Sequence, residues 1–113
     1  MVEVKIGGKD MRLRAAPPAL LFYKQEFASD LITDAMSVVS GGTVEGLKIM
    51  QLVWVMEKME NFGKSFPSFE KWLTQLEYMD LTDRETFNKI VEEIYRGFFR
   101  TAEPATAESK PTE

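Results

Sequence analysis

The 113-residue sequence contains no cysteine and no histidine. Without cysteine the chain has no disulfide bonds, no thiolate metal ligands and no cysteine nucleophile. Without histidine it lacks imidazole metal ligands and the usual general base of serine hydrolases. These two absences exclude most familiar enzyme chemistry, so we expect a protein that is not an enzyme and that needs no cofactor and no metal.

Positive charge and long apolar runs are also scarce. The 14 Lys and Arg residues are outnumbered by 18 Asp and Glu residues, and the net charge of -4 has the wrong sign for an extended nucleic-acid surface. The sequence shows neither a signal-peptide pattern nor an apolar span of about 18 residues, so we expect a soluble protein that is not exported. A protein or small-molecule partner is therefore favoured.

The composition is that of a folded chain. Hydrophobic residues make up 44% of the sequence, aromatic residues 12% and charged residues 28%, which provides enough apolar surface for a core. The length fits a single globular domain, predicted to span residues 1–102. Residues 103–113 contain no large apolar side chain and are predicted to form a disordered tail.

Residues 1–14 have the alternating pattern of a β-hairpin. Apolar and charged side chains alternate over Val2–Ile6 and again over Met11–Leu13, as expected for strands with one buried side. The Gly7-Gly8 pair between them supplies a tight turn. A two-stranded hairpin is only marginally stable by itself, so it must pack on other apolar elements.

The hairpin also carries the only basic patch of the sequence, formed by Lys5, Lys9, Arg12 and Arg14. No aromatic residue is interleaved with these charges to stack on bases, so the pattern favours protection of the strand edges over nucleic-acid binding.

Helical periodicity follows in four segments. Pro18 can begin the first, and Ser29-Asp30 can restart a second helix within it, so the pattern leaves one helix or two open. The spacing of Thr82 and Glu85 is that of a capping box, which predicts Thr82 as the cap of the last segment. The hairpin and the helical segments together predict an α+β, mostly α fold, with an N-terminal two-stranded β-hairpin packed on a bundle of four or five helices. The predicted helical segments are residues 18–39, 44–60, 67–77 and 82–101.

The segment 44–60 is predicted to be the central helix of the core. Gln51 is the only polar residue over positions 49–56, so apolar side chains cover nearly every direction around this helix. Such a helix must be surrounded by other elements, and Trp54 is predicted to be buried. Thr43 is placed to cap the start of the helix.

Two pairs of acidic residues are candidate metal ligands. Asp30 and Asp34 share a helix face, and Glu92 is adjacent to Glu93. Neither an Asp-x-Asp-x-Asp-Gly loop nor a second convergent acidic segment accompanies them, so the pattern favours solvated helix faces over a metal site.

No catalytic residue is predicted. The one ionisable cluster beside several apolar residues contains Tyr23, Lys24, Glu26 and Asp30, and nothing in it pairs a nucleophile with a base. The two Gly-Gly pairs lack the spacing and the following Lys-Ser/Thr of a phosphate-binding loop, so they are interpreted as turns.

Aromatic residues are concentrated in the second half of the chain. Phe98 and Phe99 are adjacent near the end of the last helix and point about 100° apart, so one small domain does not readily cover both rings. Core packing and a partner surface both stay open as explanations. The second predicts a groove for an apolar helix, with Arg96 and Arg100 at its rim. Its predicted residues are Phe62, Phe66, Tyr95, Phe98 and Phe99.

Two stretches of the sequence follow a pattern shared with one known family. The first is the N-terminal ribbon with Gly7-Gly8-Lys9, Arg12-Leu13-Arg14 and the run Leu21-Phe22-Tyr23-Lys24-Gln25-Glu26-Phe27-Ala28-Ser29-Asp30-Leu31, in which Ala28 replaces the usual glycine. The second is the apolar central helix with Trp54, followed by Phe69-Glu70-Lys71-Trp72-Leu73. Together these stretches resemble the tail assembly chaperones of long-tailed bacteriophages and their prophage relatives.

The resemblance implies a small acidic helical protein that binds the tape measure protein during tail assembly, keeps its long apolar helices soluble and helps recruit tail tube subunits. It also implies a place in the cytoplasm of the bacterial host and absence from the mature virion. Homo-oligomerisation is left open, and neither nucleic acid nor a membrane is an expected partner. The alternative is a small non-enzymatic adaptor or regulatory domain that docks on a folded protein, with the hairpin added to a sheet edge of the partner.

Overall fold

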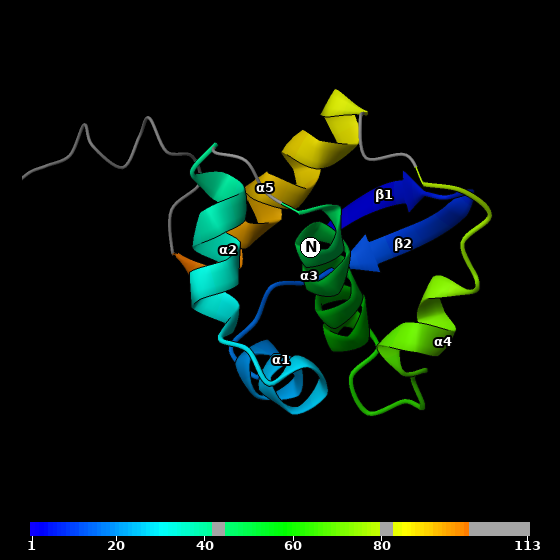
Figure 1. The fold of residues 1–113 in the computed structure, drawn as a ribbon, viewed down its shortest axis with the longest axis horizontal. Coiled ribbons are helices and arrows are strands. Elements are labelled where there is room, and N and C mark those ends of the chain that lie inside the picture. The colour runs from blue at the N-terminus through cyan, green and yellow to red at the C-terminus, as the bar shows by residue number, and fades with distance from the viewer. Residues whose placement is uncertain (42–44, 80–82, 100–113) are drawn as a thin grey trace, which may run out of the picture.

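The computed structural model describes residues 1–41, 45–79 and 83–99. Within these ranges the fold is α+β and mostly α, as predicted, with an N-terminal hairpin packed on a bundle of five helices (Figure 1). Helix α3 lies at the centre, and the hairpin and the other helices surround it. The elements are β1 (Val2–Ile6), β2 (Lys9–Leu13), α1 (Ala19–Phe27), α2 (Leu31–Val39), α3 (Gly46–Glu60), α4 (Phe69–Leu73) and α5 (Arg84–Phe98).

The hairpin has the predicted turn at Gly7-Gly8. Strands β1 and β2 are antiparallel, with Val4 opposite Met11, and Gly7 and Gly8 both adopt positive φ angles of 61° and 85°. These angles suit a two-residue turn whose twist matches that of the strands. The alternate apolar side chains are buried, and the Arg14 N–H donates a 3.0 Å hydrogen bond to the Met56 carbonyl, which ties the end of β2 to α3.

The first helical segment consists of two helices, which resolves the alternative that the sequence left open. Helix α1 ends at Phe27 because Ala28 takes a left-handed conformation with φ of 54°. Asp30 then caps α2, accepting a 2.8 Å hydrogen bond from the Thr33 N–H. An N-cap residue needs extended backbone, so Asp30 and Ala28 together change the chain direction between the two helices.

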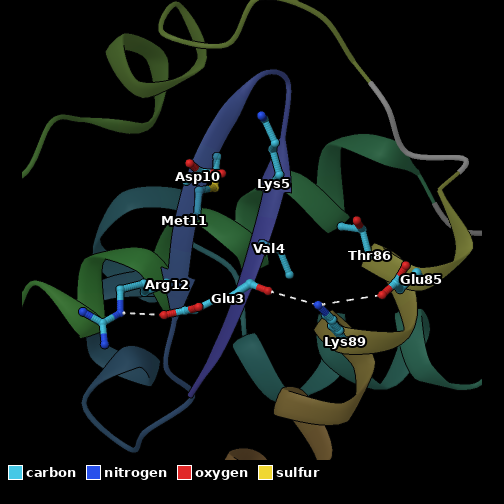
Figure 2. A pocket seen from close by; sticks show the side chains of 9 residues that line it. All are labelled: Glu3, Val4, Lys5, Asp10, Met11, Arg12, Glu85, Thr86 and Lys89. Atoms are coloured by element: carbon cyan, nitrogen blue, oxygen red, sulfur yellow. Dashed lines mark hydrogen bonds and ion pairs between the residues drawn. The ribbon is translucent and has the colours of Figure 1, made fainter.

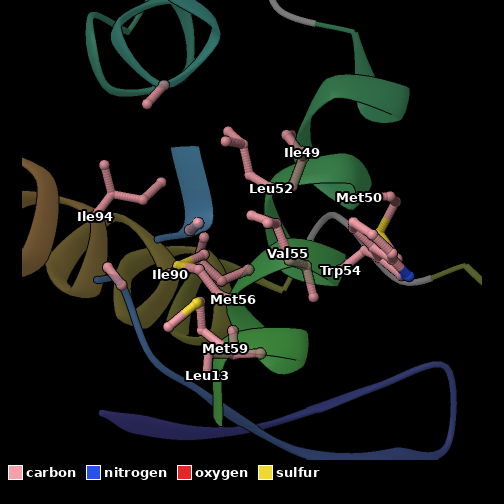
Figure 3. Close-up of a cluster of buried hydrophobic side chains, with 14 of the residues drawn as sticks. Leu13, Ile49, Met50, Leu52, Trp54, Val55, Met56, Met59, Ile90 and Ile94 are labelled. Atoms are coloured by element: carbon pink, nitrogen blue, oxygen red, sulfur yellow. The ribbon is translucent and has the colours of Figure 1, made fainter. Parts of the chain in front are cut away.

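Helix α3 is the buried centre of the domain, as its all-round apolarity predicts. Trp54 is only 2% exposed, and the apolar face of α3 meets Leu13 of the hairpin and Ile90 of α5 in one cluster (Figure 3). Leu47, in the first turn, is the exception and is half exposed. Helical periodicity therefore identified the core helix, although not the point at which its first turn emerges from the core.

The short helix α4 ends earlier than the predicted segment 67–77. Ser68 caps its start, and the helix stops at Leu73. The following residues turn back towards the hairpin, where the Glu77 N–H donates a 2.8 Å hydrogen bond to the Gly7 carbonyl. This long-range bond uses a backbone donor that a longer helix would have directed to its own carbonyls.

Helix α5 begins one position later than the capping-box pattern suggests. The capping residue is Asp83, whose carboxylate accepts a 3.1 Å hydrogen bond from the Glu85 N–H and a 2.9 Å bond from the Thr86 hydroxyl. The predicted caps Thr43 and Thr82 lie outside the described residues, as does the predicted tail at 103–113. Among the helices that are described, none is long and apolar enough to cross a membrane.

Candidate functional site

The predicted partner-binding residues occupy two places in the fold. Phe62, just beyond α3, is 64% exposed, and its ring centroid lies 5.9 Å from that of Phe22 on α1. Phe66 is partly buried, with its ring 6.1 Å from that of Trp54. These two phenylalanines thus flank the C-terminal end of α3, and the sequence did not identify Phe22 as their neighbour.

The other predicted residues lie at the end of α5. The rings of Tyr95 and Phe99 are 5.9 Å apart, and both Phe98 and Phe99 are partly buried against the core. This end of α5 is held close to the segment after β2, because Gly97 allows its backbone to approach Ala15. Among the described residues, no ring contact joins this group to Phe62 or Phe66.

Lys58 is the central residue of the first group. Its ammonium nitrogen lies 5.0 Å from the ring centroid of Phe22, 5.7 Å from that of Trp54 and 5.8 Å from that of Phe66. Each distance is within the range of a cation–π interaction. The sequence contains one signal for this arrangement, since Lys58 precedes Phe62 by one helical turn, but contact with α1 depends on the tertiary fold.

A shallow hollow of about 170 Å³ opens beside Lys58. We call the side chains of Phe22, Lys58, Phe62 and Lys64, which line it, the aromatic–lysine patch. In the described part of the chain neither lysine forms an ion pair with a carboxylate. The patch therefore combines exposed aromatic surface with local positive charge in a protein whose net charge is negative.

A larger and more polar groove, of about 640 Å³, lies between the hairpin and the first turns of α5 (Figure 2). Its charges are of both signs. The Lys89 ammonium lies 3.5 Å from the Glu3 carbonyl oxygen, and the Arg12 guanidinium lies 3.5 Å from the Glu3 carboxylate. The groove thus lacks the single sign of charge that would concentrate one class of charged ligand.

Three of the four basic residues on the hairpin are paired with acidic side chains. In addition to Arg12, Lys9 lies 3.2 Å from Glu57 and Arg14 lies 2.8 Å from Glu60. Both of these pairs join β2 or the residue after it to α3. Two of the four charges in the basic patch thus hold the hairpin against α3.

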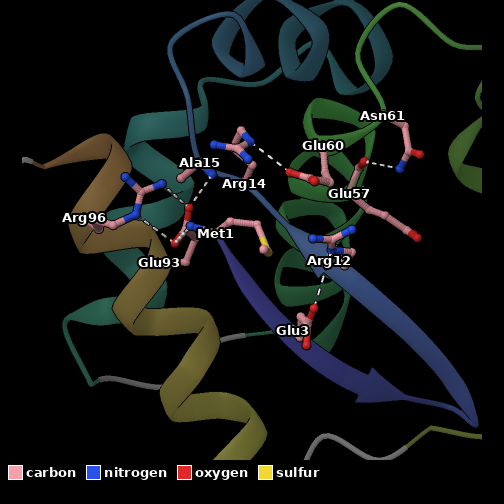
Figure 4. A network of polar contacts seen from close by, with 10 residues as sticks. All are labelled: Met1, Glu3, Arg12, Arg14, Ala15, Glu57, Glu60, Asn61, Glu93 and Arg96. Carbon is pink, nitrogen blue, oxygen red and sulfur yellow. Dashed lines mark hydrogen bonds and ion pairs between the residues drawn. The ribbon is translucent and has the colours of Figure 1, made fainter.

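Two acidic residues that the sequence assigned to solvated helix faces are buried, which corrects that interpretation. Glu93 of α5 is 1% exposed and is surrounded by donors (Figure 4). Its carboxylate accepts a 2.8 Å hydrogen bond from the Ala15 N–H, lies 3.0 Å from the amino group of Met1 and pairs with Arg96. Burial raises the pKa of Glu93, but these hydrogen bonds and charges outweigh burial and lower the pKa below 4.5.

Asp34 of α2 is the second buried acid. It accepts hydrogen bonds of 2.7 Å from the Tyr23 hydroxyl and 2.8 Å from the Ser29 hydroxyl, and the Lys48 ammonium lies 3.2 Å away. Burial alone would raise the pKa of Asp34, yet the three donors lower it overall. Burial and the neighbouring carboxylate raise the pKa of Tyr23. The network joins α1, α2 and α3 through a carboxylate that stays ionised.

Three side chains of the candidate ionisable cluster, those of Tyr23, Glu26 and Asp30, form hydrogen bonds within the fold. Tyr23 donates to Asp34, whereas the Glu26 carboxylate accepts a 2.8 Å hydrogen bond from the Phe69 N–H. Asp30 is used as the cap of α2. Within the described ranges, no group of three or more acidic side chains is placed to hold a metal ion.

Replacing Glu93 with glutamine is expected to lower the free energy of unfolding by about 2 kcal/mol near neutral pH, because Arg96 and the amino terminus lose a charged acceptor. The folded-state pKa of Glu93 is depressed, so its contribution is complete above the unfolded pKa near 4.5 and is lost as the pH falls through the folded value. Urea denaturation over a series of pH values should show the parent and the variant converging in acid. A constant difference would contradict this assignment.

Comparison of the chain with protein-family models, with curated proteins and with solved structures found no match. The aromatic–lysine patch is the candidate functional site. It is the place where an exposed aromatic ring, an apolar hollow and unpaired cations meet within the described residues.

Proposed function

We propose that this protein is a phage tail assembly chaperone that binds an apolar helical segment of the tape measure protein and helps recruit tail tube subunits in the cytoplasm of the bacterial host. The observation that carries the proposal is the exposure of Phe62 beside the hollow of the aromatic–lysine patch. The sequence resemblance to that family supplies the identity of the partner.

A binding role also agrees with the chemistry of the described residues. The buried acids Asp34 and Glu93 each accept hydrogen bonds from several donors and serve the fold. Phe62 is a large exposed apolar side chain beside a hollow, which is a common feature of protein interfaces. Such a surface holds an apolar helix by burying the residues of one helix face.

The test is co-expression with a fragment of the proposed partner, a phage tape measure protein. Phe62→Ser should weaken binding of the fragment about tenfold or more, since burying one phenylalanine ring contributes roughly 1.5 to 3 kcal/mol. Binding is measured by pull-down and by the fraction of the fragment that stays soluble. If the parent itself does not keep the fragment soluble, the proposed function is wrong.

A matched control is available in Tyr78, which is 54% exposed and lies in a different part of the fold, near the hairpin turn. Tyr78→Ser removes an exposed aromatic ring of similar size and should leave binding unchanged. Equal losses for both variants would show that the assay responds to general surface hydrophobicity rather than to the patch.

The α5 group is tested separately with Phe98→Ser combined with Phe99→Ser. Because both rings are partly buried, thermal unfolding must first show that the double variant is folded. A folded double variant that keeps the fragment soluble as well as the parent would remove Phe98 and Phe99 from the site. It would leave Phe62 and the aromatic–lysine patch as the docking surface.

A further inference from the structure

The Lys58 ammonium lies in an environment unlike that of three other basic side chains of the domain. Lys9, Arg14 and Lys48 each have a carboxylate within 3.2 Å. The Lys58 ammonium instead faces three aromatic rings, and within the described residues it has neither an acidic partner nor a hydrogen-bond acceptor. Its hydrogen-bonding capacity is therefore left to water.

A partner that covers the patch must also cover Lys58. The ammonium lies over the ring of Phe22, and Lys58 lines the same hollow as Phe62. Removing the ammonium from water without an acceptor is strongly unfavourable, because ring faces replace only part of its hydration. A purely apolar helix would leave the buried ammonium without an acceptor, whereas a helix with a carboxylate at the right position would form a charge-assisted hydrogen bond with it.

We infer that the aromatic–lysine patch selects an apolar helical segment that carries one acidic side chain among its apolar anchors, and that Lys58 is the partner of that carboxylate. Lys64, exposed at the rim of the same hollow, adds a second positive charge. The inference deepens the proposed function and rests on it, since it states which helices such a chaperone binds.

The charge distribution favours a protein segment over a nucleic acid. The chain has a net charge of -4, and most of the basic side chains on the hairpin are already paired. Two lysines are too few for a backbone-tracking groove, but they suffice for a single carboxylate. Single-stranded DNA is therefore the rival ligand that the experiment must include.

The experiment uses two synthetic amphipathic helices of about 20 residues, rich in leucine and alanine, that differ only in one glutamate or glutamine on the apolar face. Their affinities for the full-length protein are measured by fluorescence anisotropy. The parent should bind the glutamate peptide about tenfold more tightly than the glutamine peptide, and added salt should reduce the difference.

Lys58→Met keeps most of the apolar stem and removes the charge, so it should abolish the preference between the two peptides. Lys5→Met is the matched control, because Lys5 is an exposed lysine that lines the other groove and should leave the preference intact. Circular dichroism establishes that both variants are folded.

Equal binding of the two peptides by the parent would overturn the inference, and so would a failure to bind either at millimolar concentration. Binding of an oligothymidine of about 12 nucleotides as tightly as the glutamate peptide would overturn it in favour of an anion site. Failure of the proposed function is distinguishable, because solubilisation of the tape measure fragment is measured without these peptides. A parent that rescues the fragment but ignores peptide charge would lose only the inference.

Discussion

Replacing Trp54 with alanine is expected to lower the free energy of unfolding by about 3 to 5 kcal/mol. Trp54 lies at the centre of the aromatic packing, with ring centroids 5.4 Å from Phe27 and 6.4 Å from Phe69, both in edge-on geometry. Its indole N–H donates a 3.1 Å hydrogen bond to the Pro67 carbonyl. Alanine would leave a cavity between α1, α3 and α4 and an unpaired carbonyl, so the midpoint of urea denaturation should fall substantially.

Phe62→Ala is the control for this experiment. Phe62 is one of the most exposed large apolar side chains of the described chain, so its truncation should change the unfolding free energy by no more than about 0.5 kcal/mol. Comparison of the two variants distinguishes a core position from a position on the proposed docking surface. A denaturation midpoint that is unchanged by Trp54→Ala would show that Trp54 is not part of the core.

Replacing Gly97 with alanine should destabilise the protein by about 3 kcal/mol, despite the higher helix propensity of alanine. A Cβ atom at this position of α5 would lie 2.1 Å from the carbonyl oxygen of Ala15 and 2.4 Å from its Cβ. Backbone atoms cannot move away as a flexible side chain does. The new methyl group must therefore push α5 away from the segment that follows β2.

The matched control is Asn88→Ala, which also raises helix propensity within α5 but lies at an exposed position. It should leave stability unchanged or raise it by a few tenths of a kcal/mol. Thermal unfolding of both variants, followed by circular dichroism, provides the comparison. If Gly97→Ala were as stable as Asn88→Ala, the close approach of α5 to Ala15 would be wrong.

Gly97 and Glu93 act on the same contact from two sides. The glycine lets the helix backbone reach Ala15, and one helical turn earlier the Glu93 carboxylate accepts a hydrogen bond from the Ala15 N–H. Without Glu93, the Ala15 N–H just beyond the hairpin would be buried without a hydrogen-bond acceptor. The close backbone approach at Gly97 and the hydrogen bond to Glu93 thus fix the C-terminal end of α5, where Phe98 packs against the core.

Glu57 has the corresponding role at the other side of the domain. Its carboxylate accepts a 2.6 Å hydrogen bond from the Trp72 indole of α4 and lies 3.2 Å from the Lys9 ammonium of β2. The next residue along α3 is Lys58, which points to the aromatic rings instead. Helix α3 therefore uses one residue to anchor its neighbours and the adjacent one to present charge at the candidate site.

The elements that local sequence determines were predicted well. Gly7-Gly8 between two alternating segments specifies the hairpin, because paired positive φ angles suit glycine and the period-2 pattern has one buried face. The apolarity of residues 49–56, in which Gln51 is the only polar residue, identified the central helix, since a helix with apolar side chains in nearly every direction must be covered on all sides.

Tertiary structure decided the polar interior and the make-up of the patch. Asp34 and Glu93 look like surface acids in sequence, because a carboxylate is buried only where donors from distant segments converge on it, and those donors come from Lys48 and Ala15. The contact of Lys58 with Phe22 likewise depends on how α1 packs against α3. Periodicity shows which side of a helix is apolar, but only packing determines which side chains of other elements meet it.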